Sequence, residues 1–154
     1  MNDSFPRIGR LLGIDFGTVR IGIAICDENQ SIASPLEVYT RRNEKLDAEF
    51  FIKLVNETGA SGWVIGLPIH MSGDESEKSS EAREFGQWLQ SVTELPVAWI
   101  DERYSTAMAR EILNAGNLSA KQRKARLDKI AAQAILASYL ESDRDTESTD
   151  SIDD

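Results

Sequence analysis

One acidic residue stands out because it ends an apolar run. Asp15 follows residues 11–14 (LLGI), and a turn at Gly17 leads into a second apolar run over 19–25 (VRIGIAI). A carboxylate on a buried strand is costly to desolvate unless a cation meets it. Two interpretations are open: Arg20 pairs with Asp15, or Asp15 binds a metal ion or contacts phosphate. The glycine turn favours the second interpretation, because it leaves the carboxylate at an open edge of the sheet.

Further acids lie at the ends of other predicted elements. Asp101 and Glu102 close an apolar run that begins at Pro96, and Asp128 lies near the start of the last apolar helix. Each has an ordinary structural explanation, since Glu102 could pair with Arg103 and Asp128 could be a solvated residue of the helix. Carboxylates on separate rigid elements are, however, the ligands that Mg²⁺ and Mn²⁺ prefer.

Several other chemistries are excluded by composition. The chain has one histidine, His70, and one cysteine, Cys26, so it cannot assemble a zinc site of the usual His/Cys kind or an internal disulfide. A Ser-His-Asp triad would have to be built on His70 alone. No run approaches the roughly 18 apolar residues of a membrane span, and no signal-peptide core is seen. A soluble, cytoplasmic protein is therefore expected.

The net charge of −9 is unevenly distributed over the 154 residues. Residues 141–154 carry seven acids and one base, so residues 1–140 have a net charge of only −3. The tail has almost nothing apolar and is expected to be disordered. We therefore expect one folded domain over 1–140 and an acidic, disordered tail over 141–154.

The elements that must position the acids follow from hydrophobic periodicity. The pattern predicts an antiparallel meander of three strands, with Pro35 placing the third at an edge, and then alternating helices and strands. Apolar strands without a polar face are typical of a sheet covered by helices on both faces. The three tryptophans fall within these elements and are expected in the core. The predicted strands cover residues 8–15, 19–26, 32–39, 62–67 and 96–102, and the predicted helices cover about 46–58, 81–90, 105–114 and a final stretch to about 140.

This order of elements, with acids on the first strand, the fifth strand and the last helix, resembles the RNase H-like nuclease fold. Four local motifs are similar to those of the YqgF family, also called RuvX. They are DFGTVRIG over 15–22, VIGLP over 64–68 with Met71 and Gly73, DERYST over 101–106, and Asp128 with the closing helix. The resemblance covers residues 11–140 and implies an α/β, RNase H-like fold with a mixed five-stranded sheet, three antiparallel strands then two parallel, with helices on both faces.

The resemblance also implies a metal-dependent nuclease. Family members are assigned to processing the 5′ end of pre-16S rRNA, with an older assignment as Holliday junction resolvases. In such chemistry two cations about 4 Å apart activate water and stabilise the leaving oxygen. The expected catalytic residues and ligands of Mg²⁺ or Mn²⁺ are Asp15, Glu102 and Asp128. The alternative that is not an enzyme is an RNA-binding assembly factor without catalytic activity.

Nucleic acid, either pre-rRNA or branched DNA, is the expected partner, with no membrane; a monomer and a homodimer are both compatible with this interpretation. Thr18, Arg20 and Arg103 are candidate phosphate contacts, since a guanidinium matches phosphate oxygens bidentately. A basic run is either a solvated helix face or a patch that contacts the nucleic-acid backbone, and the nuclease interpretation favours the patch. The candidates in that run are Lys121, Arg123, Lys124 and Arg126.

The chain departs from related patterns at two points. The fourth predicted strand has no acid, so Glu102 must stand in, with Asp101 as a further candidate. Adjacent strand residues point to opposite faces, and hydrophobicity does not say which of the two faces the site; the resemblance favours Glu102. Residues 74–81 are more acidic than expected beside a phosphate backbone.

Actin-like ATPases and sugar kinases open with a similar motif but need a duplicated second domain, and the sequence has no internal repeat.

Overall fold

The computed structural model describes residues 5–68, 77–101 and 129–142 of the chain. Their five strands form one sheet in the order β3-β2-β1-β4-β5. The β1–β2 and β2–β3 pairs are antiparallel, and the β1–β4 and β4–β5 pairs are parallel. The predicted mixed sheet is confirmed. The strands are β1 (Leu11–Asp15), β2 (Arg20–Cys26), β3 (Ala33–Thr40), β4 (Gly62–Leu67) and β5 (Val97–Asp101).

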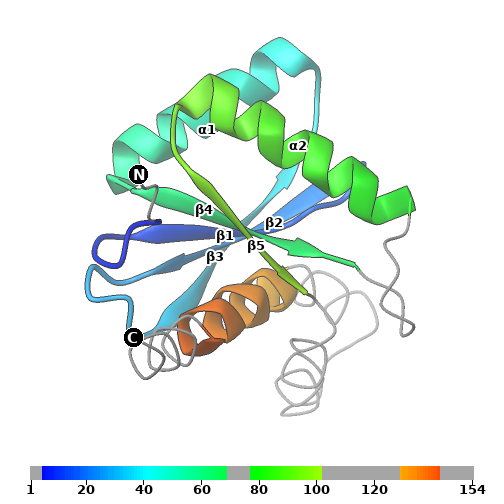
Figure 1. The fold of residues 1–154 in the computed structure, drawn as a ribbon. Helices are drawn as coiled ribbons and strands as arrows, with labels where there is room; N and C mark the ends of the chain where they lie inside the picture. Colours follow the sequence, from blue (N-terminus) through cyan, green and yellow to red (C-terminus); the bar gives the residue numbers. More distant parts are fainter. Residues whose placement is uncertain (1–4, 69–76, 102–128, 143–154) are drawn as a thin grey trace, which may run out of the picture.

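Helices cover both faces of this sheet, as the apolar strands predicted. Helices α1 (Glu44–Thr58) and α2 (Glu77–Thr93) lie together on one face, and the C-terminal helix over residues 129–142 lies on the other (Figure 1). No helix in the described part of the chain is long and apolar enough to cross a membrane. The predicted helix over 105–114 and residues 143–154 of the predicted tail lie outside the described residues. Residues 141–142, which were expected in the tail, belong to the C-terminal helix.

The alternation of side chains along each strand produces two cores. Leu12 and Ile14 of β1 point to the α1/α2 face, where they join a cluster that contains Phe51. Leu11 points to the other face and joins a cluster that contains Leu136 of the C-terminal helix. Each strand therefore needs apolar residues at successive positions, which is why β1 and β4 read as continuous apolar runs.

The boundaries of α1 follow its sequence signals. The Asn43 side chain caps the helix by accepting a 2.9 Å hydrogen bond from the backbone N–H of Leu46. The helix ends at Gly59, whose φ of 70° is left-handed and whose N–H donates to the Val55 carbonyl at 2.8 Å. Glycine adopts this conformation without steric cost, so the helix ends where the predicted helix over about 46–58 ends.

The third strand lies at an edge of the sheet, as Pro35 predicted. Its register against β2 shifts between Ile23 and Ala24, which pair with Glu37 and Pro35, so Leu36 is an extra residue in β3. Proline cannot donate a ladder hydrogen bond, and a bulge at an edge strand accommodates it.

Some boundaries differ from the sequence-based prediction. Helix α2 begins at Glu77 rather than at residue 81, because its first turn carries only polar side chains and gives no apolar period. Strand β1 begins at Leu11 rather than at Ile8, whose side chain is 76% exposed.

Of the three tryptophans, which were all expected in the core, Trp63 is fully buried, whereas Trp88 and Trp99 are only half-buried at the border of the core.

Candidate functional site

The site is built where three parallel strands end at the same edge of the sheet. Asp15 is the last residue of β1, Leu67 the last of β4 and Asp101 the last of β5. In open sheets with helices on both faces, ligands bind at the carboxyl ends of parallel strands. Asp15 is half-buried at this edge, as expected for a carboxylate that a glycine turn leaves accessible.

The face on which Asp15 lies follows from its neighbour Gly13. A Cβ atom on Gly13 would lie 2.8 Å from the Cβ of Leu136 and 3.1 Å from the carbonyl oxygen of Ala132, so the C-terminal helix packs directly on β1 at this point. Residues two apart on a strand share a face. Asp15 therefore lies on the face covered by the C-terminal helix, whose described part begins one residue after Asp128 in sequence.

Glycines flank Asp15 on both neighbouring strands. Gly22 of β2 is its direct cross-strand partner, and the parallel register of Ile14 with Ile65 brings Gly66 of β4 beside it. A glycine inside a strand weakens it and commonly marks close approach of a ligand. The carboxylate thus has no side chain beside it on either strand. Both glycines belong to the motifs over 15–22 and 64–68 that resemble those of the RuvX family. Their position beside Asp15, however, follows only from the strand register.

A cavity of about 410 Å³ opens at Asp15 and is called here the Asp15 cavity. It brings together three of the predicted site residues, Asp15, Thr18 and Arg20, from the end of β1, the turn and the start of β2. Lys78 and Glu81 from the first turns of α2 also line it. Neither residue was predicted as part of the site: Lys78 lies before the predicted start of the helix at residue 81, and Glu81 was expected as the first residue of that helix. Among the described lining residues the acids and bases are balanced.

The alternation along β5 distinguishes its last residues. Val97 and Trp99 pack into the core on the α1/α2 side, whereas Ile100 packs into the core on the side of the C-terminal helix. Asp101 shares the parity of Trp99, so it lies on the face opposite Asp15. Ile100 therefore lies on the same face of the sheet as Asp15. Gly66 of β4 pairs with Ile100 and has no side chain, so no side chain of β4 lies between Asp15 and Ile100 on that face.

The other predicted site residues are outside the described part of the chain. These are Glu102, Arg103, Lys121, Arg123, Lys124, Arg126 and Asp128. Within the described ranges, no group of three or more His, Cys, Asp or Glu residues is close enough to hold a metal ion. Asp15 itself suits a hard cation, since it is a half-buried carboxylate lining a polar cavity with glycines on both sides.

A second cavity, of about 640 Å³, adjoins the first and is called here the Arg41 cavity. Its lining includes Phe16, Thr18, Val19 and Glu81, which also line the Asp15 cavity. The remaining described lining residues are Arg41, Arg42, Glu44, Asp47, Glu84, Phe85 and Trp88. The two cavities therefore share the tip of the β1–β2 hairpin as a common wall.

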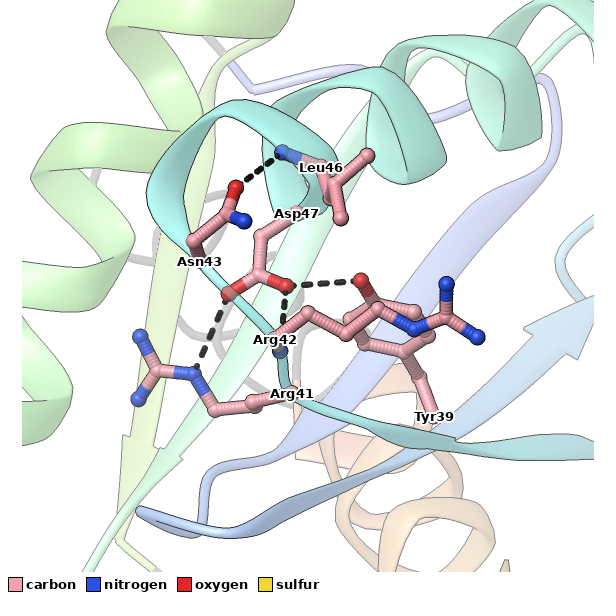
Figure 2. A network of polar contacts seen from close by, with 6 residues as sticks. All are labelled: Tyr39, Arg41, Arg42, Asn43, Leu46 and Asp47. Carbon is pink, nitrogen blue, oxygen red and sulfur yellow. Dashed lines mark hydrogen bonds and ion pairs between the residues drawn. The ribbon is translucent and has the colours of Figure 1, made fainter.

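Asp47 of α1 organises one side of the Arg41 cavity (Figure 2). Its carboxylate accepts hydrogen bonds from the hydroxyl of Tyr39 at 2.6 Å and from the backbone N–H of Arg42 at 2.9 Å. One carboxylate oxygen also lies 3.5 Å from Nε of Arg41. Asp47 is buried, so these three contacts compensate for its desolvation.

Burial and the contact with Asp47 change the pKa of the Tyr39 phenol. Burial, together with the hydrogen bond to Asp47 and the negative charge of that carboxylate, raises the pKa of Tyr39 to about 12. The neutral phenol is the form that can donate to Asp47. The network therefore persists throughout the neutral pH range.

Comparisons with known proteins agree with this architecture. Residues 9–142 match the family described as "RuvX: Holliday junction resolvase". A relative from Rhodopirellula baltica, named "Putative pre-16S rRNA nuclease", is 46% identical over 142 residues, which cover 92% of this chain and 82% of the relative. A relative of the same name from Rhodobacter capsulatus is 38% identical over 138 residues, covering 90% and 87% of the two chains.

Among solved structures, Thermus thermophilus RuvC in complex with a Holliday junction substrate superposes with a TM-score of 0.53 at 13% identity, covering 87% of this chain and 96% of that one. At this identity the similarity concerns the fold alone, and it confirms the RNase H-like architecture. The family match spans nearly all of the described residues, and the relatives are similar over most of their own length. The chain therefore belongs to the RuvX family.

Proposed function

We propose that this protein is a metal-dependent nuclease that hydrolyses phosphodiester bonds during processing of the 5′ end of pre-16S rRNA. The observation that carries the proposal is the placement of Asp15, an accessible carboxylate at the carboxyl edge of the sheet with a glycine on each side. The names of the relatives, pre-16S rRNA nucleases, indicate the substrate.

Asp15, Glu102 and Asp128 are the proposed metal ligands and catalytic residues. Glu102 follows Ile100 by two positions, and Ile100 lies on the face of Asp15. Asp128 precedes, in sequence, the described part of the helix that packs on Gly13 of that face. Bound Mg²⁺ or Mn²⁺ would supply Lewis-acid activation of water and of the scissile phosphate.

The remaining candidates would hold the substrate. Thr18 and Arg20 line the Asp15 cavity and would contact the phosphate group that enters it. Lys78, from the first turn of α2, also lines this cavity and adds a third donor. Arg103 and the basic run over 121–126 would contact the backbone on either side, where binding is largely independent of sequence.

The test is incubation of the purified protein with precursor 16S rRNA, with and without Mg²⁺ or Mn²⁺. We expect cleavage with either cation, loss of cleavage with EDTA, and no effect of a zinc-selective chelator. Asp15→Asn should abolish cleavage and retain the fold. Cleavage that survives EDTA would overturn the metal-dependent mechanism, and full activity of Asp15→Asn would overturn the assignment of the site.

A second candidate substrate is four-way DNA. The description of the RuvX family and the fold similarity to a junction-bound RuvC favour it. A synthetic four-way junction in the same assay separates the two: faster cleavage of the junction would assign the enzyme to DNA. Binding of precursor rRNA without cleavage under any metal condition would instead support a non-catalytic assembly factor.

A further inference from the structure

The Arg41 cavity contains a planar cation fixed against aromatic rings. The guanidinium carbon of Arg41 lies 5.4 Å from the ring centroid of Phe16 and 5.4 Å from that of Phe85. The ion pair with Asp47 fixes the near end of the group. Trp88, half-buried, packs against Phe85 with ring centroids 5.6 Å apart. A guanidinium that lies over aromatic rings, in a cavity that a tryptophan also lines, is a surface on which an unpaired base can stack.

The charges of the cavity argue against a phosphate there. Its described lining carries two arginines but four carboxylates. The charges of Arg41 and Asp47 cancel. The remaining charges are one positive charge, on Arg42, and three negative charges at the rim, on Glu44, Glu81 and Glu84. Carboxylates accept hydrogen bonds and repel anions. The cavity therefore suits a group that presents N–H donors.

The cavity also lies beside the position proposed for the reaction. Val19, 65% exposed, forms part of the wall between the two cavities, and its carbonyl accepts a 2.8 Å hydrogen bond from the backbone N–H of Arg41. The hairpin tip is thereby tied to the segment that carries the guanidinium. A strand whose phosphate enters the Asp15 cavity would cross this tip toward the Arg41 cavity.

We propose that the Arg41 cavity binds one unpaired nucleobase, preferably guanine, of the nucleic-acid strand that is cleaved at Asp15. The base would stack on Arg41 and Trp88, and its Watson–Crick edge would donate to the rim glutamates. Guanine is preferred because its N1–H and N2–H donors lie side by side and match one carboxylate. The inference rests on the proposed nuclease function and adds a base preference near the cleavage point.

The test measures binding without cleavage, in EDTA, on the full chain. The indole N–H signal of Trp88 is followed by NMR and identified by its absence in Trp88→Phe. The probes are GMP, UMP and ribose 5-phosphate, which carry the same phosphate and differ only in the base. We expect GMP to shift the signal at the lowest concentration and ribose 5-phosphate to leave it unchanged. Equal shifts by GMP and ribose 5-phosphate, or no shift by any probe at millimolar concentration, would overturn the proposal.

Two substitutions identify the groups involved. Glu84 is exposed and lines only the Arg41 cavity, so Glu84→Gln should leave the fold intact and weaken GMP binding about tenfold, because a charged acceptor is lost. A phosphate site would respond in the opposite direction, so tighter GMP binding by Glu84→Gln would overturn the proposal.

Arg41→Lys keeps the charge but removes the planar surface. The matched control is Arg83→Lys, because the guanidinium carbon of Arg83 also lies over an aromatic ring, 5.3 Å from the centroid of Trp99, and Arg83 is not among the described lining residues of either cavity. Only Arg41→Lys should weaken binding. Equal loss in both variants would contradict stacking on Arg41. The cleavage assay is separate: cleavage without base binding overturns this inference alone, and GMP binding without cleavage overturns the nuclease proposal alone.

Discussion

At the residue scale, the end of β5 separates two neighbouring acids. Asp101 shares the face of Trp99, opposite Asp15, whereas Ile100 lies on the face of Asp15. We predict that Glu102→Gln reduces cleavage by at least a hundredfold, as Asp15→Asn does, because a metal ligand is lost, and that Asp101→Asn costs less than tenfold. The measurement is kcat on precursor rRNA, with far-UV circular dichroism to verify the fold. An inactive Asp101→Asn beside an active Glu102→Gln would reverse the assignment.

The Tyr39–Asp47 contact makes a prediction about alkaline pH. The pKa of Tyr39 is raised from its usual 10 to about 12, so between these values the folded state retains a proton that the unfolded state has lost. The stabilisation is complete below pH 10 and is lost as pH rises through about 12. Tyr39→Phe removes this titration, so its free energy of unfolding should fall less between pH 10 and 12 than that of the unmodified protein. Urea unfolding at both pH values measures the difference, and equal slopes would contradict it.

At the element scale, the contact between β1 and the C-terminal helix makes a prediction. Gly13→Ala places a Cβ 2.8 Å from that of Leu136, so the helix must shift. Overpacking of this kind costs about 1–3 kcal/mol in the free energy of unfolding. Because Asp128, a proposed metal ligand, directly precedes the described part of this helix in sequence, cleavage per folded molecule should fall as well.

The matched control for Gly13→Ala is Gly59→Ala at the end of α1. A Cβ on Gly59 meets nothing within 4 Å, but its φ of 70° is unfavourable for alanine, so stability should fall by about 1 kcal/mol. Cleavage per folded molecule should remain unchanged. Equal activity in the two variants would show that the packing of the C-terminal helix on β1 does not position the site.

The basic run provides a second test at this scale. Replacing Lys121, Arg123, Lys124 and Arg126 together by glutamine should weaken binding to all sequences alike and flatten its salt dependence, because phosphate contacts release counterions. Binding of precursor and scrambled RNA across a series of salt concentrations measures this. An unchanged dependence of binding on salt would contradict this and favour the alternative that the run is a solvated helix face.

At the scale of the whole molecule, charge is concentrated in the C-terminal segment. Residues 143–154 carry six acids and one base, so their deletion changes the net charge of the chain from −9 to −4. We predict an unchanged melting temperature, since Ile152 is the one large apolar residue there, and tighter RNA binding at low salt that disappears at high salt. A fall in melting temperature by several degrees would show that the segment is docked.

The sequence by itself determined the order of elements and the mixed sheet. The helical periodicity of α1, the stop at Gly59 and the unbroken apolar runs of β1 and β4 are local signals, so the sequence was sufficient to predict these elements. It also identified Asp15 as an accessible carboxylate. It failed at the start of α2, where the first turn is polar and helical structure is indicated only by the packing that follows.

The tertiary structure alone decided what lies beside Asp15. Strand register placed Gly22 and Gly66 on its two sides, and the packing of Ile100 assigned the two faces of β5. It also brought Arg41, which lies between β3 and α1, into one cavity with Phe85 and Trp88 of α2. Such relations depend on pairing and packing between residues far apart in the chain, which no local pattern of side chains encodes.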